Sequence, residues 1–472
     1  MGAERKRMPK MIGRTTNILV LVVLAAFLMG WIFKTPEPRK HPNREPVYFW
    51  HMWTASWKSN VEAICDGFNN SQDRYEVIPL SLPQGVSDSK FLLAVTGGSP
   101  PDCMAQWHQV VPQFADKNLL MPLDEIMDAE ELEHLKSQAY PIAQKIAFYN
   151  GRPYCMPLAL DVRAYYYRLD HLHEAGLLPD TVPERIVSEE DYLKVREALP
   201  ETLEQLTDWG RKLNVFDSKK RLVRMGFAPE WFRMFAPVFG GGFYDWEANE
   251  LTINTPENLR TLTFLLEEQK AIGYERMARF TSSLTGNYGA DWPFAIGKKS
   301  ISLDGQWRVQ QLSRFAPDVP YATSPIPPPE EGGRTCAGWV YGNFMVIPSG
   351  ARNPEGAWAF IRFWTGLDDP DRAADFYVRS GWLPPRPQIA ETARYRAYVR
   401  EHPQFQTFLE ILASPNIEPT PPVPFQLLMF DMIKRTDEAV MRGSLTPKEA
   451  LEMLEEEVRD IQSRRKELRH ET

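Results

Sequence analysis

The 472-residue chain has few cysteines, and they do not form a metal-binding pattern. Cys65, Cys103, Cys155 and Cys336 are scattered along the sequence and lack the paired spacing of a zinc site. Four cysteines are also too few for a disulfide scaffold in a protein of this size. Buried free thiols are the preferred interpretation, and one or two disulfides are the alternative if the protein is exported. The sequence predicts no metal site and no cofactor.

An excess of positive charge is also absent. The chain has 54 Lys and Arg against 62 Asp and Glu, which gives a formal net charge of −8. A nucleic-acid surface normally carries a basic patch, so we expect no nucleic-acid partner. The glycine run Gly240–Gly242 lacks the Lys-Ser/Thr pair of a phosphate-binding loop. No catalytic triad stands out.

A long apolar run occurs near the N-terminus. Residues 18–33 contain neither a charge nor a proline and follow a basic segment, 1–16. As a helix, this run would span about 24 Å, and the basic flank predicts a cytoplasmic N-terminus. We expect an uncleaved signal anchor at 17–34 and a Pro-rich linker at 35–46, with the main domain on the extracytoplasmic side of the cell membrane. The alternative is a cleaved signal peptide and a secreted protein.

The chain beyond the linker alternates strand and helix patterns. Val47–Trp50 and Arg74–Pro79 are typical of strands, and Val61–Asn69 between them has apolar residues at helical spacing. A strand, helix, strand order predicts a parallel βαβ unit and an α/β fold. The apolar fraction of 43% is ample for a packed core, and the length suggests about two or three domains.

The stretch Phe294–Trp364 combines several recognisable patterns. Ile301–Leu303 is a short β-like run that stops at Asp304-Gly305, and Asn343–Pro348 is a second such run. Asn353 then provides an N-cap, with Pro354 at the first helical position. The helix that follows has one apolar face.

These patterns resemble the extracellular solute-binding proteins of ABC importers, family 1, the maltose-binding-like group. The resemblance rests on motifs in the expected order: Phe294 with Gly297-Lys298, Gly305-Gln306-Trp307, and the run from Val346 to Ile361. Earlier in the chain, Ala94, Gly98, Pro101 and Asp102, the segment Tyr149–Pro157, and the segment Thr252–Glu257 match the same family. The resemblance covers roughly residues 47–461.

The resemblance implies a two-lobe, type II periplasmic-binding fold whose lobes are joined by crossing hinge strands. We expect the first lobe at 47–157 plus about 322–372, and the second at 158–321 plus about 373–472. Such a protein captures its ligand by closing the lobes on it and is not an enzyme. Its expected partners are a small-molecule ligand, ABC permease subunits and, through the N-terminal helix, the membrane.

The 14 tryptophans favour a sugar as the ligand. Sugar rings present apolar C–H faces that stack on aromatic rings, and their hydroxyls need fixed polar partners. Asp161 would accept hydrogen bonds from hydroxyls, and Arg163 or Arg386 would donate them. A structural ion pair is the alternative for Asp161 and Arg163, which we expect on one face of a buried strand, Leu158–Arg168. The predicted site comprises Trp53, Trp107, Asp161, Arg163, Trp231, Trp307, Trp339 and Arg386.

The sequence therefore predicts a membrane-tethered receptor that delivers a sugar or oligosaccharide to an ABC importer. One alternative is a sensory or scaffold module of the same fold without a transporter. The other is a glycosidase, which would need two carboxylates about 5–10 Å apart, such as Asp161 with Glu230 or Asp304.

Overall fold

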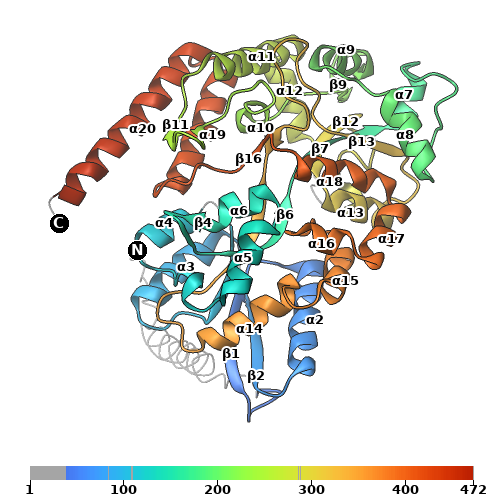
Figure 1. Cartoon of the computed structure of the whole chain (residues 1–472). Coiled ribbons are helices and arrows are strands. Elements are labelled where there is room, and N and C mark those ends of the chain that lie inside the picture. The colour runs from blue at the N-terminus through green and yellow to red at the C-terminus, as the bar shows by residue number, and fades with distance from the viewer. Residues whose placement is uncertain (1–38, 83, 108–109, 285, 287–288, 471–472) are drawn as a thin grey trace, which may run out of the picture. The chain divides into compact units, whose positions relative to one another are not determined.

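The computed structural model describes residues 39–82, 84–107, 110–284, 286 and 289–470 (Figure 1). The predicted cytoplasmic segment and signal anchor lie outside these residues. Among the described residues, no helix combines the length and the apolar composition needed to span a membrane. The chain divides into two compact units after Glu45, and the second unit, Pro46–Thr472, contains the elements discussed below, apart from Glu45 at the start of the first strand.

A five-stranded sheet forms the first half of this unit. Its strand order is β2-β1-β3-β15-β6. Strands β1 and β3 run parallel, whereas β15 is antiparallel to both β3 and β6. The predicted strand, helix, strand order near the start is confirmed, because α2 (Ala55–Ser71) connects β1 to the neighbouring β2. The strands are β1 (Glu45–His51), β2 (Tyr75–Ser81), β3 (Cys103–Trp107), β6 (Met156–Asp161) and β15 (Tyr341–Val346).

Helices from distant parts of the chain cover this sheet. In Figure 1, α14 (Pro354–Thr365) and α15 (Pro370–Ser380), drawn in orange, lie beside the blue helix α2. The predicted cap of α14 is confirmed, since the Asn353 side chain accepts a hydrogen bond from the Gly356 N–H at 3.0 Å. Helices α16 (Pro387–Ala390), α17 (Ala393–Glu401) and α18 (Gln406–Ala413) add side chains to the same hydrophobic core.

A three-stranded antiparallel sheet forms the second half. Its order is β12-β7-β13, with β7 (Arg163–Arg168) in the centre, β12 (Ile301–Gly305) on one side and β13 (Tyr321–Ser324) on the other. A second core covers one face of this sheet. Its helices include α9 (Leu203–Leu213), α11 (Pro256–Ile272), α19 (Gln426–Met441) and α20 (Pro447–His470).

The three tyrosines of β7 show how this sheet joins the two cores. Tyr165 and Tyr167 belong to the second core, whereas Tyr166 packs with the first core against Trp292 and Phe294. This division follows from the alternation of side chains along a strand. The first core thus contains residues from both predicted lobes, and the limits of the lobes stay a prediction.

All four cysteines are free thiols, which agrees with the preferred interpretation of the sequence rather than with the disulfide alternative. Three of them are buried, and Cys336 is partly exposed. Burial raises the pKa of the Cys103 thiol well above its ordinary value. Buried, protonated thiols of this kind are inert packing residues.

Candidate ligand-binding site

The chain passes from one sheet to the other at Val162, and this corrects one prediction. The sequence predicts a single strand, Leu158–Arg168, with Asp161 and Arg163 on the same face. In the structure, Asp161 ends β6, which pairs with β15, and Arg163 begins β7, which pairs with β12. The two side chains therefore belong to different sheets, because the strand breaks where its pairing partners change.

Arg163 is held by a carboxylate from the neighbouring strand. Its Nη1 donates to Asp304 Oδ1 at 2.9 Å, and Arg308 Nε donates to Asp304 Oδ2 at 2.8 Å. Asp304 also accepts from the Gly305 N–H at 2.8 Å. Both partners of the Arg163–Asp304 pair are mostly buried, with side chains 19% and 13% exposed. A buried carboxylate shared by two arginines fixes the position of both guanidinium groups.

Asp161 is held by an amide instead of an ion pair. Gln306 Nε2 donates to Asp161 Oδ1 at 2.7 Å and to the Leu160 carbonyl at 3.2 Å. Burial raises the pKa of Asp161, while Gln306 and the nearby Arg163 act in the opposite direction. The alternative interpretation, an ion pair between Asp161 and Arg163, is not what the structure shows, because Asp161 contacts Gln306 and Arg163 contacts Asp304.

Two tryptophans lie over the Arg163 guanidinium. Its carbon is 4.5 Å from the centre of the Trp307 ring and 5.8 Å from that of Trp231. Both tryptophans are half-buried. Trp231 has a φ of +67°, a strained backbone conformation for a bulky residue, and such strain is often found at functional sites.

Arg233 and Tyr341 complete this group. The Arg233 guanidinium lies 5.3 Å from the Trp231 ring centre and donates from Nε to the Tyr341 hydroxyl. Tyr341 is also the residue opposite Asp161 in the β15–β6 pairing. We call the following residues the crossing cluster: Asp161, Arg163, Trp231, Arg233, Asp304, Gln306, Trp307 and Tyr341.

Several buried polar atoms of the crossing cluster lack a partner. Within the part of the chain that the structure describes, Arg163 Nε, Gln306 Oε1 and Trp307 Nε1 make no hydrogen bond. Buried polar atoms are nearly always paired, so each unpaired atom needs a physical reason. Two of these atoms are donors and one is an acceptor, and the hydroxyls of a polyhydroxylated ligand can pair with either kind.

The structure does not bring all eight predicted site residues together. Asp161, Arg163, Trp231 and Trp307 are members of the crossing cluster. Trp339 lies beside it, with its ring centre 6.5 Å from that of Tyr341, but only 1% of Trp339 is exposed. The backbone of Trp107 ends β3 opposite Asn343, and its side chain lies outside the described part.

Trp53 and Arg386 have neighbours in the first core. The Trp53 ring packs against Trp364 at 5.7 Å and Trp382 at 5.4 Å between ring centres. Arg386 is 3% exposed and donates to the Gly366 carbonyl, and burial lowers its pKa. In the described part of the chain, neither residue contacts the crossing cluster, so their roles in ligand binding stay predictions without a supporting contact.

Sequence reasoning missed Gln306, Arg233 and Tyr341 as site residues. Gln306 lies between Gly305 and Trp307, within a family motif that the sequence analysis recognised, and this position could have indicated a site residue. Arg233 and Tyr341 are 108 positions apart, and no local pattern connects them.

His51, at the end of β1, is another residue that the sequence analysis did not single out. It is fully buried, neither ring nitrogen has a partner among the described residues, and burial lowers its pKa to about 4, helped by Lys58.

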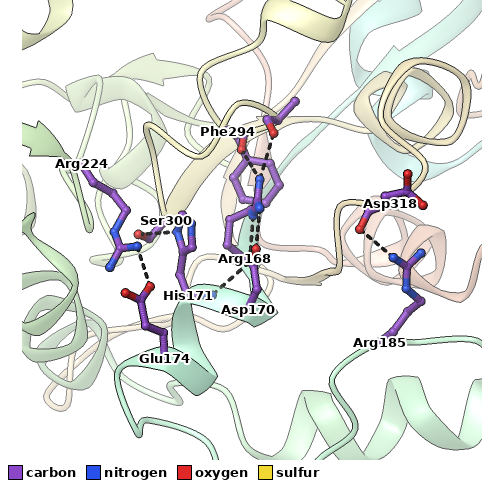
Figure 2. Close-up of polar contacts among 10 residues, drawn as sticks. Arg168, Asp170, His171, Glu174, Arg185, Arg224, Phe294, Ser300 and Asp318 are labelled. Carbon is purple, nitrogen blue, oxygen red and sulfur yellow. Dashed lines mark hydrogen bonds and ion pairs between the residues drawn. The ribbon is translucent and has the colours of Figure 1, made fainter.

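A second group of polar contacts, centred on Arg168, gives the Phe294 motif a structural role (Figure 2). Arg168, at the far end of β7, donates from Nη1 to the carbonyls of Phe294 at 3.0 Å and Ala295 at 2.9 Å, and from Nε to Asp170 at 2.9 Å. His171 Nδ1 lies 3.0 Å from Ser300 Oγ. Desolvation by burial lowers the His171 pKa to about 4. These contacts fasten the turn after Trp292 to the sheet and leave the principal donors of Arg168 occupied.

The described residues contain no group of three or more His, Cys, Asp or Glu side chains placed to hold a metal ion. The crossing cluster itself offers aromatic faces and fixed hydrogen-bonding groups. Such a combination binds and orients a ligand.

Two known proteins are similar in sequence to this chain over most of its length. A maltotriose-binding protein of Pyrococcus abyssi is 22% identical over 341 residues, which cover 72% of this chain and 66% of the relative. The sn-glycerol-3-phosphate-binding periplasmic protein UgpB of Salmonella typhimurium is 21% identical over 435 residues, which cover 86% of this chain and 90% of the relative.

Solved structures show the fold. The structure described as CpMnBP1 with mannotriose bound superposes with a TM-score of 0.72 at 23% identity, covering 87% of this chain and 99% of the other. The substrate-binding protein Lmo0181 from Listeria monocytogenes, in complex with cycloalternan, gives 0.67 at 18% identity, with coverage of 89% and 100%. The chain has the α/β fold of periplasmic binding proteins.

The family model of the bacterial extracellular solute-binding proteins matches residues 55–368, which is more than half of the chain. This match includes the Phe294, Gly305-Gln306-Trp307 and Val346–Ile361 motifs. The proteins of this family bind solutes and are not enzymes, so the glycosidase alternative is set aside. The chain belongs to the bacterial extracellular solute-binding protein family.

Proposed function

We propose that the protein binds a sugar or oligosaccharide at the crossing cluster and delivers it to an ABC importer on the extracytoplasmic side of the membrane. The observation that carries the proposal is the pair of half-buried tryptophans, Trp231 and Trp307, stacked about Arg163 beside unpartnered polar atoms. The relatives support it, because their descriptions name maltotriose, mannotriose and cycloalternan.

The chemistry of the cluster suits a neutral ligand with many hydroxyls. The tryptophan rings offer flat apolar faces to the C–H side of a sugar ring. Trp307 Nε1 and Arg163 Nε are donors without a partner, and Gln306 Oε1 is an acceptor without one. A sugar hydroxyl can both donate and accept, so one ligand can satisfy all three.

The charges of this region also favour a neutral ligand. Asp304 is paired with Arg163 and Arg308, and Glu230 is paired with Lys299 at 2.9 Å. Because these three cations already have carboxylate partners, and Arg233 donates to the Tyr341 hydroxyl, a phosphate ester would gain less from them than from free cations. We therefore expect a neutral saccharide to bind more tightly than sn-glycerol 3-phosphate, which the description of UgpB names.

Ligand capture would use the connection between the two sheets. Asp161 and Arg163 flank the crossing at Val162, and a ligand that contacts both sheets stabilises the arrangement in which they are close. We propose a two-lobe, type II arrangement with a hinge at this crossing. Anchoring by an N-terminal helix remains part of the proposal as well.

A calorimetric titration of the full-length protein tests the binding proposal. Maltotriose, mannotriose and sn-glycerol 3-phosphate are suitable ligands, since the relatives' descriptions name them. We expect micromolar or tighter binding of at least one oligosaccharide. Binding of glycerol 3-phosphate alone would contradict the proposal of a neutral sugar.

Delivery to an importer needs a separate experiment. Deleting the gene should abolish uptake of the bound sugar by the cells. Normal uptake in the deletion strain, together with loss of a cellular response to the sugar, would support the sensory module instead.

A further inference from the structure

A cavity of about 800 Å³ lies away from the crossing cluster. It is lined by the turn between β8 (Val215–Phe216) and β9 (Leu222–Arg224), by the first two residues of β9, and by residues of α12 (Tyr274–Ser282). A small hydrophobic core of its own, which includes Leu222 and Phe280, supports this region. None of the lining residues belongs to the crossing cluster, so the proposed sugar site does not account for the cavity.

The cavity has an excess of positive charge. The whole chain carries a formal net charge of −8, yet five lining cations stand against two lining carboxylates here, a local excess of three. Such a local excess creates a potential that attracts anions. The cations are Lys219, Lys220, Arg221, Arg276 and Arg279, and the carboxylates are Asp217 and Glu275.

The two carboxylates are already engaged with neighbouring groups. Asp217 accepts from Arg221 Nε at 2.7 Å and from the backbone N–H groups of Lys219 and Arg221, both at 2.9 Å, which closes the hairpin turn. Glu275 is paired with Arg279 at 3.1 Å. Lys219 and Lys220 are exposed in the hairpin turn, and among the described residues their ammonium groups have no ion-pair partner.

The walls of the cavity add apolar surface to this charge. Phe280 is buried beneath it, and Tyr274, at the start of α12, is 47% exposed. Leu222 and Val223 line the hairpin side. The volume falls in the range of about 300–1,000 Å³ that is typical of small-molecule sites. The cavity thus combines a cationic rim with an apolar wall.

We infer that this cavity is a second binding site, for a molecule with a phosphate group attached to an apolar or aromatic body. A phosphate monoester carries about −1.5 to −2 charges near pH 7, so it can neutralise both unpaired ammonium groups. A ligand with a single carboxylate carries only one charge and would suit them less well. The ligand is either a soluble phosphate compound, such as a nucleotide, or the headgroup of an anionic lipid. The inference does not depend on sugar binding at the crossing cluster.

Calorimetry on the full-length protein, with inorganic pyrophosphate and ATP as probes, tests this inference. A Lys219→Gln, Lys220→Gln double variant should weaken binding by about tenfold or more, because it removes the two unpaired charges. The control is Lys434→Gln with Lys448→Gln. This control changes the net charge by the same amount. Its two lysines lie away from the cavity, where Lys434 pairs with Glu438 on α19 and Lys448 pairs with Glu452 on α20. Thermal unfolding of both variants checks that they remain folded.

Sedimentation with vesicles that contain phosphatidic acid, a lipid whose headgroup is a phosphate monoester, distinguishes the two sources. Lysine-dependent binding to these vesicles without binding of the soluble probes assigns the ligand as a lipid headgroup. Lysine-dependent binding of pyrophosphate or ATP assigns a soluble compound. Absence of binding to every probe, or equal weakening in the two double variants, overturns the inference.

Discussion

Gly305 shows how one small residue positions the crossing cluster. A Cβ atom at this position would lie 2.2 Å from the six-membered part of the Trp307 ring, which is far inside contact distance. Trp307 can therefore lie against the end of β12 and reach Arg163 only because position 305 has no side chain. The Gly305-Gln306-Trp307 motif is thus explained by packing as well as by ligand binding.

A Gly305→Ala variant should displace the Trp307 ring and weaken ligand binding. Overpacking of this kind costs typically about 1–3 kcal/mol of stability. We expect at least about a tenfold loss of affinity for the sugar, measured by calorimetry, if the ring is part of the site.

Gly67→Ala is the matched control for this prediction. Its new Cβ would meet only Phe363 at 3.6 Å, an ordinary contact, in the interior of α2. We expect this variant to be neutral or slightly stabilising, since alanine is the better helix former. Equal affinities in the two glycine variants would show that the position of Trp307 is unimportant for binding.

Glu418 makes stability depend on pH. Burial raises its pKa to about 7 from an ordinary value of 4.5, against the attraction of Arg334 and Lys145. Between these two pH values the folded state binds the proton that the unfolded state has released. The contribution of Glu418 to stability therefore improves as the pH falls from above 7 towards 4.5, and its charge is a cost at higher pH.

A Glu418→Gln variant should be more stable than the wild type at pH 8 by about 2–3 kcal/mol. The advantage should shrink as the pH falls and disappear below about pH 4.5, where the wild-type carboxyl is protonated in both the folded and the unfolded state. Thermal unfolding of both proteins across this pH range measures the difference. A difference that stays constant with pH would contradict the assignment.

Individual site residues could be predicted only in part. Trp307 and Arg163 stand out in the sequence because a tryptophan after a turn and a charge in an apolar strand are unusual. The Arg233–Tyr341 contact could not be predicted, because it joins residues 108 positions apart. Trp53 has the same loop setting in the sequence as Trp231, yet its ring packs in the first core.

At the scale of elements, an ion pair connects the two cores through α20. Arg465, near the end of this helix, pairs with Asp116 at the end of α4 (Val111–Asp116). Helix α20 packs in the second core through Leu451, Leu454 and Val458, whereas Val111 and Phe114 of α4 belong to the first core. The pair therefore stabilises the arrangement in which these two elements meet.

An Arg465→Ala variant should loosen this arrangement. The pair is partly buried, with side chains 31% and 9% exposed, so its loss should cost about 1 kcal/mol. We expect a larger radius of gyration for the ligand-free protein in small-angle X-ray scattering. Arg464→Ala is the control, because Arg464 pairs with Asp460 within the same helix. The same radius in both variants would indicate that the pair does not hold the cores together.

Elements with strong end signals were predicted well from the sequence. Helix α14 has Asn353 as its cap and Gly366 in a left-handed conformation at its end, and both signals are local. The break between β6 and β7 has no such signal. Leu158–Arg168 is apolar and β-prone throughout, and only the pairing of each half with a different sheet ends the first strand at Asp161.

At the scale of the whole molecule, the family motifs predicted the fold because they are spread over most of the chain in a fixed order. The sharing of the cores could not be predicted. Helices α15 to α18 pack with the first core, although they follow the second sheet in the sequence. Such packing depends on long-range contacts, which no single segment of sequence reveals.

The central claim is that the crossing cluster binds the sugar, and calorimetry on a Trp307→Ala variant tests it most directly. The control is Trp209→Ala, which removes another half-buried tryptophan, on α9. With the oligosaccharide that binds the wild type most tightly, we predict a loss of affinity of about tenfold or more for Trp307→Ala and little change for Trp209→Ala. Unchanged affinity in Trp307→Ala, with the protein still folded, would contradict the account.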